Sequence, residues 1–224
     1  MGMGMQMDKF HYYKILLKRR RKSNYGWQLE EKFVKQYKSI LAIDEAGRGA
    51  LAGPLAVGGF FLDKTTLKFL RNNKIEFFDS KQLSAKSRQL IAGLIKKFKL
   101  PHKVFLIPAK TIDKRGVNHA FLLGTRKLLE YFLPKAVLLD GRRITHSFSL
   151  PLYFLVKGDQ RLNSLGGASI VAKVKRDNQM IKLALRYPRY QFEKHKGYGT
   201  ELHRQLLQKH GLCPSHRHSF CLHR

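Results

Sequence analysis

The chain has 224 residues, of which 44 are Lys or Arg and 15 are Asp or Glu, so its formal net charge is +29. A hydrophobic content of 43% can form a core, which argues against disorder along the whole chain. The longest weakly polar run, from Gly49 to Leu62, is broken by glycines and a proline and is shorter than the ~18–20 apolar residues of a membrane-spanning helix. So large a positive excess predicts a polyanionic partner, above all nucleic acid.

The N-terminal residues 1–26 show no sustained periodicity and contain the basic run Lys18-Arg19-Arg20-Arg21-Lys22. We expect a flexible basic arm there, ahead of one domain over residues 27–224. The arm would contact phosphates, act as a nuclear signal, or be a solvated extension without a specific role. Two cysteines give no disulfide framework and no secretory signal is found, so the default expectation is a cytoplasmic protein.

The hydrophobic pattern predicts strands and helices in the following chain order. A charged helix over 28–37 precedes a buried strand over 39–43, a strand over 54–62 and a helix over 85–98 with Ser84 as its N-cap. Then come a strand over 103–107, a helix over 112–132, strands over 136–139 and 153–156, and helices over 164–186 and 199–210. This order predicts an α/β fold, a mixed sheet covered by helices, with a helical C-terminal part.

Acidic residues follow three of the predicted strands. Asp44 and Glu45 follow the first, Asp140 follows the strand over 136–139, and Asp159 comes shortly after the last. Ligands of such sheets gather where strands end, so these carboxylates are expected to converge. A carboxylate cluster is tolerated mainly when hard cations neutralise it, and two Mg²⁺ ions could then stabilise both oxygens of a phosphodiester displacement.

Each of these acids has a simpler interpretation as a turn or helix-capping residue. Adjacent strand residues point to opposite faces, so Asp44 and Glu45 can share a site only if regular strand geometry stops there. The following residues, Ala46-Gly47-Arg48-Gly49, are expected to stop it. Asp177 lies four residues after Lys173 on a predicted helix, where a surface ion pair explains it.

The triplet Gly47-Arg48-Gly49 allows two interpretations. Its glycines would let the backbone approach a ligand closely, while the arginine offers donors to a phosphate or a hydroxyl. Alternatively, the triplet is a tight turn with one exposed arginine. Spacing alone does not decide between them.

The chain resembles ribonuclease HII, the type 2 ribonuclease H, through motifs in the same order over roughly residues 39–220. They are Asp44-Glu45-Ala46-Gly47-Arg48-Gly49, Leu51-Ala52-Gly53-Pro54, Asp79-Ser80-Lys81-Gln82-Leu83-Ser84, Leu139-Asp140-Gly141, Lys157-Gly158-Asp159, Ala168-Ser169-Ile170-Val171-Ala172-Lys173-Val174 with Arg176-Asp177, Tyr187-Pro188, His195-Lys196-Gly197-Tyr198-Gly199-Thr200 and His216-Arg217-His218-Ser219-Phe220. The sister family, ribonuclease HIII, typically lacks the Gly-Arg-Gly triplet after the acidic pair.

This resemblance implies a ribonuclease H-like fold with a mixed five-stranded sheet, flanking helices and a helical C-terminal region. It also implies cleavage of RNA in RNA/DNA hybrids, and incision 5′ of single ribonucleotides in duplex DNA, as in ribonucleotide excision repair, with 3′-hydroxyl and 5′-phosphate products. A monomer is expected. The chain stops four residues after Phe220, so no sliding-clamp-binding tail is expected.

The resemblance also assigns roles to residues. It implies that Asp44, Glu45, Asp140 and Asp159 bind two Mg²⁺ or Mn²⁺ ions and are catalytic. It implies that Gly47, Arg48 and Gly49 read the 2′-hydroxyl of the ribonucleotide, and that Tyr198 stacks on the next deoxyribose. Lys81, Ser169 and Lys173 are candidate phosphate or scaffold contacts.

Two competing interpretations remain at this level. Cys213, His216, His218 and Cys221 form a C-x2-H-x-H-x2-C array that could suggest zinc, although four ligands so tightly spaced make one tetrahedral site awkward. A non-catalytic RNA-binding or ribosome-associated protein would also fit the charge and the aromatic content. It would not explain acids after three strands.

Overall fold

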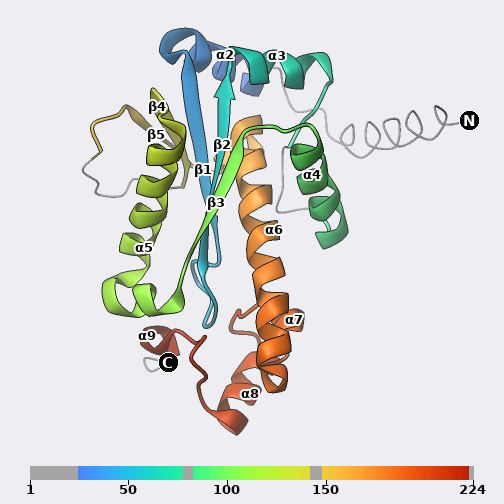
Figure 1. Ribbon diagram of the computed structural model, residues 1–224, viewed down its shortest axis with the longest axis vertical. Coiled ribbons are helices and arrows are strands. Elements are labelled where there is room, and N and C mark those ends of the chain that lie inside the picture. Colours follow the sequence, from blue (N-terminus) through green and yellow to red (C-terminus); the bar gives the residue numbers. More distant parts are fainter. Residues whose placement is uncertain (1–24, 78–82, 142–147, 222–224) are drawn as a thin grey trace, which may run out of the picture.

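The computed structural model describes residues 25–77, 83–141 and 148–221 (Figure 1). Lys81 and most of the predicted N-terminal arm lie outside the described residues. A five-stranded mixed sheet with strand order β3-β2-β1-β4-β5 forms the centre of the molecule, as the sequence predicted. The strands are β1 (Ser39–Ala46), β2 (Leu55–Asp63), β3 (His102–Ile107), β4 (Ala136–Asp140) and β5 (Leu152–Leu155).

Helices precede, connect and follow the strands along the chain. The α-helices are α2 (Tyr25–Tyr37), α3 (Lys64–Asn72), α4 (Ala85–Lys97), α5 (Ala109–Phe132), α6 (Asn163–Arg186), α7 (Phe192–His195), α8 (Glu201–His210) and α9 (His218–Cys221), with 3-10 turns η2 (Gly158–Gln160) and η3 (Pro188–Tyr190). The Ser84 hydroxyl accepts a hydrogen bond from Ser87 N at 3.1 Å, which confirms the predicted N-cap of α4.

The sheet combines two kinds of pairing. β1, β2 and β3 pair antiparallel, whereas β1, β4 and β5 pair parallel. Because β1 and β4 are parallel, their C-terminal ends lie at the same edge of the sheet. The hairpin turn from β1 to β2 leaves from that edge too. A right-handed crossover is the usual way to join such parallel neighbours.

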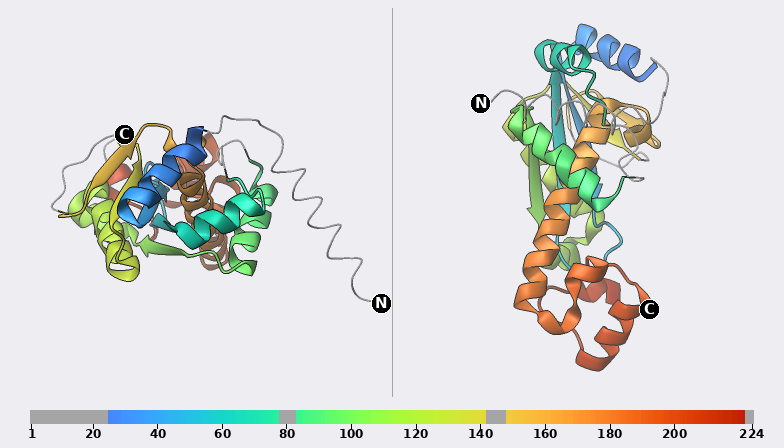
Figure 2. Two further views of the ribbon diagram at one scale, coloured as in Figure 1. Left: turned by 90° about the horizontal axis from the view of Figure 1, so that it is seen from above. Right: turned by 90° about the vertical axis from the view of Figure 1, so that its right-hand side faces the viewer.

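Helices cover both faces of the sheet (Figures 1 and 2). On one face α5 packs on a cluster that includes Leu41, Val57 and Leu139. On the other face α6, with α2, α3 and α4 beside it, packs on a cluster that includes Ala42, Phe60 and Leu138. Burial of apolar surface in these two layers stabilises the folded state by about 25 cal/mol per Å² and is the main stabilising contribution.

Several boundaries differ from the predicted ones. β1 does not stop at the acidic pair: its antiparallel register with β2 continues through Glu45 opposite Val57 and Ala46 opposite Ala56. α3 was not predicted, although Asp63 caps it by accepting from Thr66 N. α5 begins three residues earlier than predicted and is broken at Gly116, where φ is +80°.

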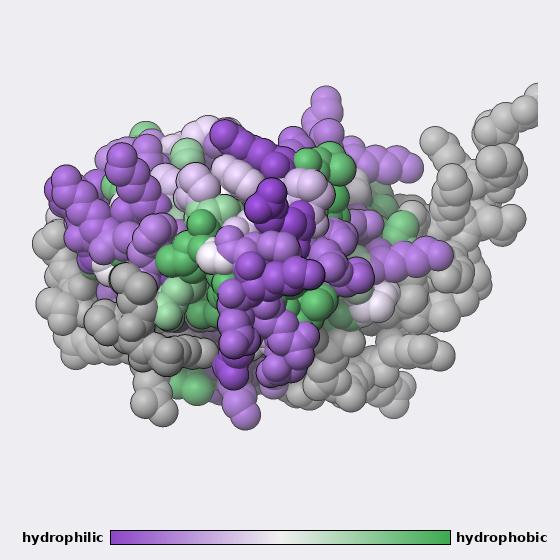
Figure 3. Space-filling model, turned by 90° about the horizontal axis from the view of Figure 1, so that it is seen from below, coloured by the Kyte–Doolittle hydropathy of each residue, from purple (hydrophilic) through white to green (hydrophobic). Residues whose placement is uncertain are grey.

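The C-terminal helices form a separate layer beyond one end of the sheet (Figures 1 and 2). A small cluster of Ala52, Met180, Tyr190, Phe192 and Cys213 joins them to the long helix α6 and to the β1–β2 loop. Hydrophilic side chains gather over the outer surface of this end, with smaller hydrophobic areas between them (Figure 3). In the described part of the chain, no helix combines the length and apolar character needed to cross a membrane.

Candidate active site

Asp44 and Asp140 lie next to each other on adjacent strands. β1 and β4 are parallel, and their last registered pair is Ile43 with Leu139, so an aspartate follows on each strand. Neighbouring strands lie about 4.8 Å apart. Because side chains alternate along a strand, both aspartates belong to the face that α6 covers, and Asp44 is only 5% exposed.

Asp159 joins this pair through the turn that follows β5. Gly158 N donates a hydrogen bond to Asp140 Oδ1 at 2.7 Å, which ties η2 to the end of β4. The neighbouring side chain of Asp159 is completely buried. Three aspartates from β1, β4 and η2 are thus delivered to one edge of the sheet, as their positions after predicted strands indicated.

Glu45 is placed differently from the prediction. Because β1 continues through Ala46, Glu45 points to the α5 face, opposite to Asp44. Its Oε1 accepts from Arg48 Nε at 2.6 Å, and Arg48 Nη1 donates to Asn118 Oδ1 on α5 at 2.8 Å. The expectation that strand geometry stops at the acidic pair was wrong, since the backbone pairing to β2 persists beyond both acids.

The four acids predicted to be catalytic are not gathered into a closed metal site in the described part of the chain. Among the described residues, no three His, Cys, Asp or Glu side chains are grouped closely enough to hold a metal ion. Asp44 and Asp140 follow neighbouring parallel strands and Asp159 follows the residue that bonds Asp140, whereas Glu45 would have to turn away from Arg48 to join them. Carboxylate oxygen is the donor that Mg²⁺ and Mn²⁺ prefer.

The loop that follows β1 is shaped around Gly47. Gly47 has φ +92°, and a Cβ there would lie 1.9 Å from Arg176 Nε, so both the backbone and the space require glycine. Gly49 instead faces open space. Among the described residues, the amides of Gly47, Arg48 and Gly49 donate no backbone hydrogen bond; Gly47 is buried, whereas Arg48 is partly exposed and Gly49 is exposed, so a ligand can approach the loop at these two residues.

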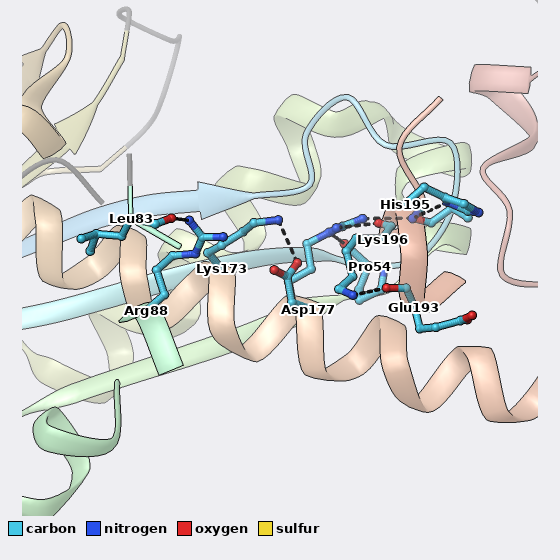
Figure 4. Close-up of polar contacts among 11 residues, drawn as sticks. Pro54, Leu83, Arg88, Lys173, Asp177, Glu193, His195 and Lys196 are labelled. Carbon is cyan, nitrogen blue, oxygen red and sulfur yellow. Dashed lines mark hydrogen bonds and ion pairs between the residues drawn. The ribbon is translucent and has the colours of Figure 1, made fainter. Parts of the chain in front are cut away.

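Arg176 holds this loop by its carbonyl groups. The guanidinium is fully buried and donates to Pro54 O and Ala52 O, both at 3.1 Å, and to Lys196 O at 2.9 Å (Figure 4). Burial lowers the pKa of Arg176. It thus joins the loop after β1 to the segment that carries Tyr198.

Arg217 supports the same loop from the other side. Its fully buried guanidinium donates to Gly53 O at 3.0 Å and to Arg48 O at 2.9 Å. Burial, and then the neighbouring positive charge of Arg176, lowers the pKa of Arg217 to about 9. Two buried cations therefore bind the carbonyls of Arg48, Ala52, Gly53 and Pro54 and fix the course of the loop.

Tyr198 lies beside the loop and beneath two cationic side chains. Its partly exposed ring is 4.9 Å from Arg176 Cζ and 5.3 Å from Lys173 Nζ, measured to the ring centroid. Lys173 also pairs with Asp177 at 2.8 Å, one turn along α6 (Figure 4), which confirms the predicted ion pair. Ser169, one turn before Lys173, is 7% exposed.

Neither Arg176 nor Arg217 was predicted to have a role in the site. A signal for Arg176 was present: Ala168, Ala172, Met180 and Ala184 are buried at intervals of four or eight residues on α6, and Arg176 interrupts that apolar row. A charged residue within a buried helical stripe indicates a partner elsewhere in the fold. No local pattern marks Arg217.

Comparisons with known proteins agree with this architecture. The family model described as Ribonuclease HII matches residues 41–223. A ribonuclease HII of Endomicrobium trichonymphae is 41% identical over 189 residues, which cover 83% of this chain and 87% of that relative. The ribonuclease HII in the PCNA:RNase HII complex from Archaeoglobus fulgidus superposes with a TM-score of 0.67 at 22% identity, covering 83% of this chain and 96% of that one.

A more distant structure carries a metal. Bst-RNase HIII in complex with Mn²⁺ superposes with a TM-score of 0.65 at 17% identity, covering 82% of this chain and 67% of that one. At such low identity the likeness concerns the fold. The shared fold includes the five-stranded sheet described above.

Proposed function

This chain belongs to the ribonuclease HII family of endonucleases, which cleave RNA in RNA/DNA hybrids, and from that premise we propose that it also incises duplex DNA 5′ of a single embedded ribonucleotide. The products would be a 3′-hydroxyl and a 5′-phosphate, and the protein would act as a monomer. The observation that carries this proposal is the loop after β1: the exposed part of the loop, at Arg48 and Gly49, has amides without a backbone acceptor and follows the aspartate-bearing end of β1. That loop can distinguish ribose from deoxyribose.

The aspartate set fits a hard divalent cation in its donor chemistry. Asp44, Asp140 and Asp159 supply only oxygen, and their ionised forms repel one another without a cation between them. We assign Mg²⁺ or Mn²⁺ to this set, with Glu45 as the fourth carboxylate. When bound, two such ions lower the pKa of an attacking water and stabilise the leaving 3′-oxygen.

The chain's own groups then place the scissile phosphate. Lys173 and Ser169 on α6 face the same side as Tyr198 and are assigned to the phosphate backbone, together with Lys81. The net charge of +29 supplies attraction to the duplex that does not depend on sequence. Glu45, held 2.6 Å from Arg48, is released when Arg48 turns to the substrate.

The Gly47-Arg48-Gly49 loop is assigned to the 2′-hydroxyl. This hydroxyl both donates and accepts, and it is the group by which a protein tells RNA from DNA. Arg176 and Arg217 fix the loop carbonyls, so the amides need no rearrangement to meet the hydroxyl. Tyr198, supported by Arg176, is assigned to the deoxyribose on the 3′ side, where a 2′-hydroxyl would crowd its ring.

The deciding experiment uses a DNA duplex with one ribonucleotide and an all-DNA duplex as control. With Mg²⁺ or Mn²⁺ we expect a single cut on the 5′ side of the ribonucleotide and no cut in the control. Asp44→Asn should lose cleavage while retaining duplex affinity, because it removes a carboxylate and not a phosphate contact. Wild-type binding without cleavage in either metal would refute the enzymatic assignment, and equal loss of both in Asp44→Asn would make that residue structural.

Tyr198→Ala tests the second half of the proposal. We expect the cut to spread to positions within an RNA tract, because the ring no longer marks the RNA–DNA junction. Affinity should change less than position selectivity. An unaltered cleavage pattern would remove Tyr198 from the site.

A further inference from the structure

Three buried histidines form a cluster that contacts the main chain of Gly197 and Tyr198. His195, His203 and His216 are 7%, 0% and 1% exposed. The rings of His195 and His203 stack with centroids 4.1 Å apart, and the centroids of His203 and His216 are 5.3 Å apart. Nothing in the proposed chemistry uses these groups.

A connected series of hydrogen bonds fixes the tautomers of the His216 and His203 rings. His216 Nδ1 accepts from Cys213 N–H at 2.9 Å, so in the neutral ring the hydrogen sits on Nε2. His216 Nε2–H then donates to His203 Nε2 at 3.1 Å, and His203 Nδ1–H donates to the main-chain oxygen of Tyr198 at 3.0 Å. Every ring nitrogen of this pair has one partner.

His195 holds the preceding residue in the same way. Its Nδ1 accepts from Gly197 N–H at 3.1 Å and its Nε2–H donates to Tyr190 O at 2.8 Å. The Gly197 amide and the Tyr198 carbonyl are therefore both anchored to imidazoles. Arg176 binds the carbonyl of the neighbouring Lys196 at 2.9 Å, so three consecutive residues of this segment are held by buried side chains.

We propose that His203 and His216 are positioning residues that orient the Tyr198 main chain, and through it the ring that reads the RNA–DNA junction. The proposal rests on the function assigned to Tyr198 above. It requires both rings to be neutral, because a proton on His203 Nε2 would face the Nε2–H of His216. Burial, followed by the charge of a neighbouring histidine, lowers the pKa of each to about 4, which keeps the pair neutral near pH 7.

The matched variants His216→Gln and His216→Asn separate positioning from packing. A glutamine amide nitrogen reaches the place of Nε2 and can still donate to His203, whereas an asparagine oxygen reaches the place of Nδ1 and keeps only the Cys213 bond. We expect His216→Gln to retain the wild-type ratio of junction incision to hybrid cleavage. His216→Asn should lower that ratio about three- to tenfold, the effect of one lost hydrogen bond, mainly through kcat.

His102→Asn is the control for a histidine substitution. His102 starts β3, at the end of that strand farther from the β1–β2 loop, and in the described part of the chain its ring bonds locally, to Leu100 O. It should leave the ratio unchanged. If the Gln and Asn variants at position 216 change the ratio equally, the histidine pair is packing alone and the proposal is overturned.

A measurement on the unsubstituted protein stands independently of folding defects in the variants. Long-range ¹H–¹⁵N spectra of the imidazoles should show His203 as the Nδ1–H tautomer and His195 and His216 as Nε2–H tautomers at pH 7. A protonated ring or the opposite tautomer at His203 would contradict the hydrogen-bond chain.

The two proposals fail in different ways. An unchanged cleavage pattern in Tyr198→Ala overturns the junction role of the ring, and the positioning proposal falls with it. A changed pattern in Tyr198→Ala together with a wild-type ratio in His216→Asn overturns the positioning proposal alone.

Discussion

The guanidinium of Arg176 fills the space that a side chain at position 47 would need. An added Cβ at Gly47 would lie 1.9 Å from Arg176 Nε and 2.6 Å from Arg176 Cδ, and the φ of +92° disfavours any other residue. The glycine and the arginine therefore depend on each other. Neither can change without moving the loop that follows β1.

We predict that Gly47→Ala lowers the free energy of unfolding by about 1–3 kcal/mol, because it combines backbone strain with overpacking. Incision at a single ribonucleotide should fall by more than tenfold, since the loop amides are displaced. Urea unfolding and single-turnover cleavage measure the two effects.

Two other glycines serve as controls for this substitution. Gly93 is exposed within α4 and has open space around its Cβ position, so Gly93→Ala should stabilise the protein by about 0.5–1 kcal/mol. Gly49→Ala also has room and should fold normally, so any loss of incision there reports on contact with substrate. A Gly47→Ala protein as stable as Gly93→Ala would contradict the steric argument.

Arg176→Lys should destabilise the protein by about 3 kcal/mol or more. One ammonium nitrogen cannot reach carbonyl groups on two segments at once, so buried acceptors lose charged hydrogen bonds worth about 1.5–3 kcal/mol each. Arg186→Lys, at an exposed position on the same helix, should stay within about 0.5 kcal/mol of the parent. Equal unfolding midpoints for the two variants would show that the buried contacts contribute nothing.

The buried carboxyl group of Glu30 predicts that the stability of the folded protein depends on pH. Its side chain on α2 is completely buried and accepts from Ser164 N at 2.7 Å, and desolvation raises its pKa from 4.5 to about 7. The folded state thus binds this proton more tightly than the unfolded state. The resulting stabilisation is complete below pH 4.5 and is lost as the pH rises through about 7.

Glu30→Gln removes that titration. The difference in unfolding free energy between variant and parent should move in favour of the variant by about 3 kcal/mol from pH 4.5 to pH 7.5. The contributions of titrating histidines cancel in this difference, because the same histidines are present in both proteins. Glu130→Gln, at an exposed position on α5, is the control, and parallel curves for Glu30→Gln and the parent would refute the buried titration.

The proposed contact of Lys173 with phosphate predicts a change in the salt dependence of duplex binding. The logarithm of duplex affinity should fall linearly with the logarithm of salt concentration, by a slope of about 0.9 per phosphate contacted. Lys173→Met should reduce the magnitude of that slope by about one contact and weaken binding to all duplexes alike. An unchanged slope would mean that Lys173 contacts no phosphate and contributes only the 2.8 Å ion pair with Asp177.

The sequence was sufficient to predict the sheet, because its strands are short apolar runs bounded by turn residues. It was insufficient for the end of β1, where the partner strand supplies Gly58 and Val57 opposite the acids and prolongs the pairing. It also missed α3, whose start carries two adjacent threonines with low helix propensity. Packing of Leu67 and Leu70 on the core outweighs that propensity.

At the site, strand ends were enough to place three aspartates at one end of the sheet, although in the described part of the chain they are not grouped closely enough to hold a metal ion. The direction of Glu45 followed from the strand continuing, which no local pattern shows. The carbonyl contacts of Arg176 and Arg217 were beyond sequence reasoning for another reason: their partners are 122 to 169 positions away, except Lys196 O. Only the family's collinear motifs hinted that these segments meet.

That separation along the chain bears on the order in which the protein assembles. Contacts between residues so far apart form only after long loops have closed, and a growing chain folds from its N-terminal side. The edge of the sheet that bears Asp44 can pair with β2 long before Arg217 is synthesised. The β1–β2 loop therefore reaches its final conformation last, so the loop to which we assign the 2′-hydroxyl is completed only when the segment that carries Arg217 docks.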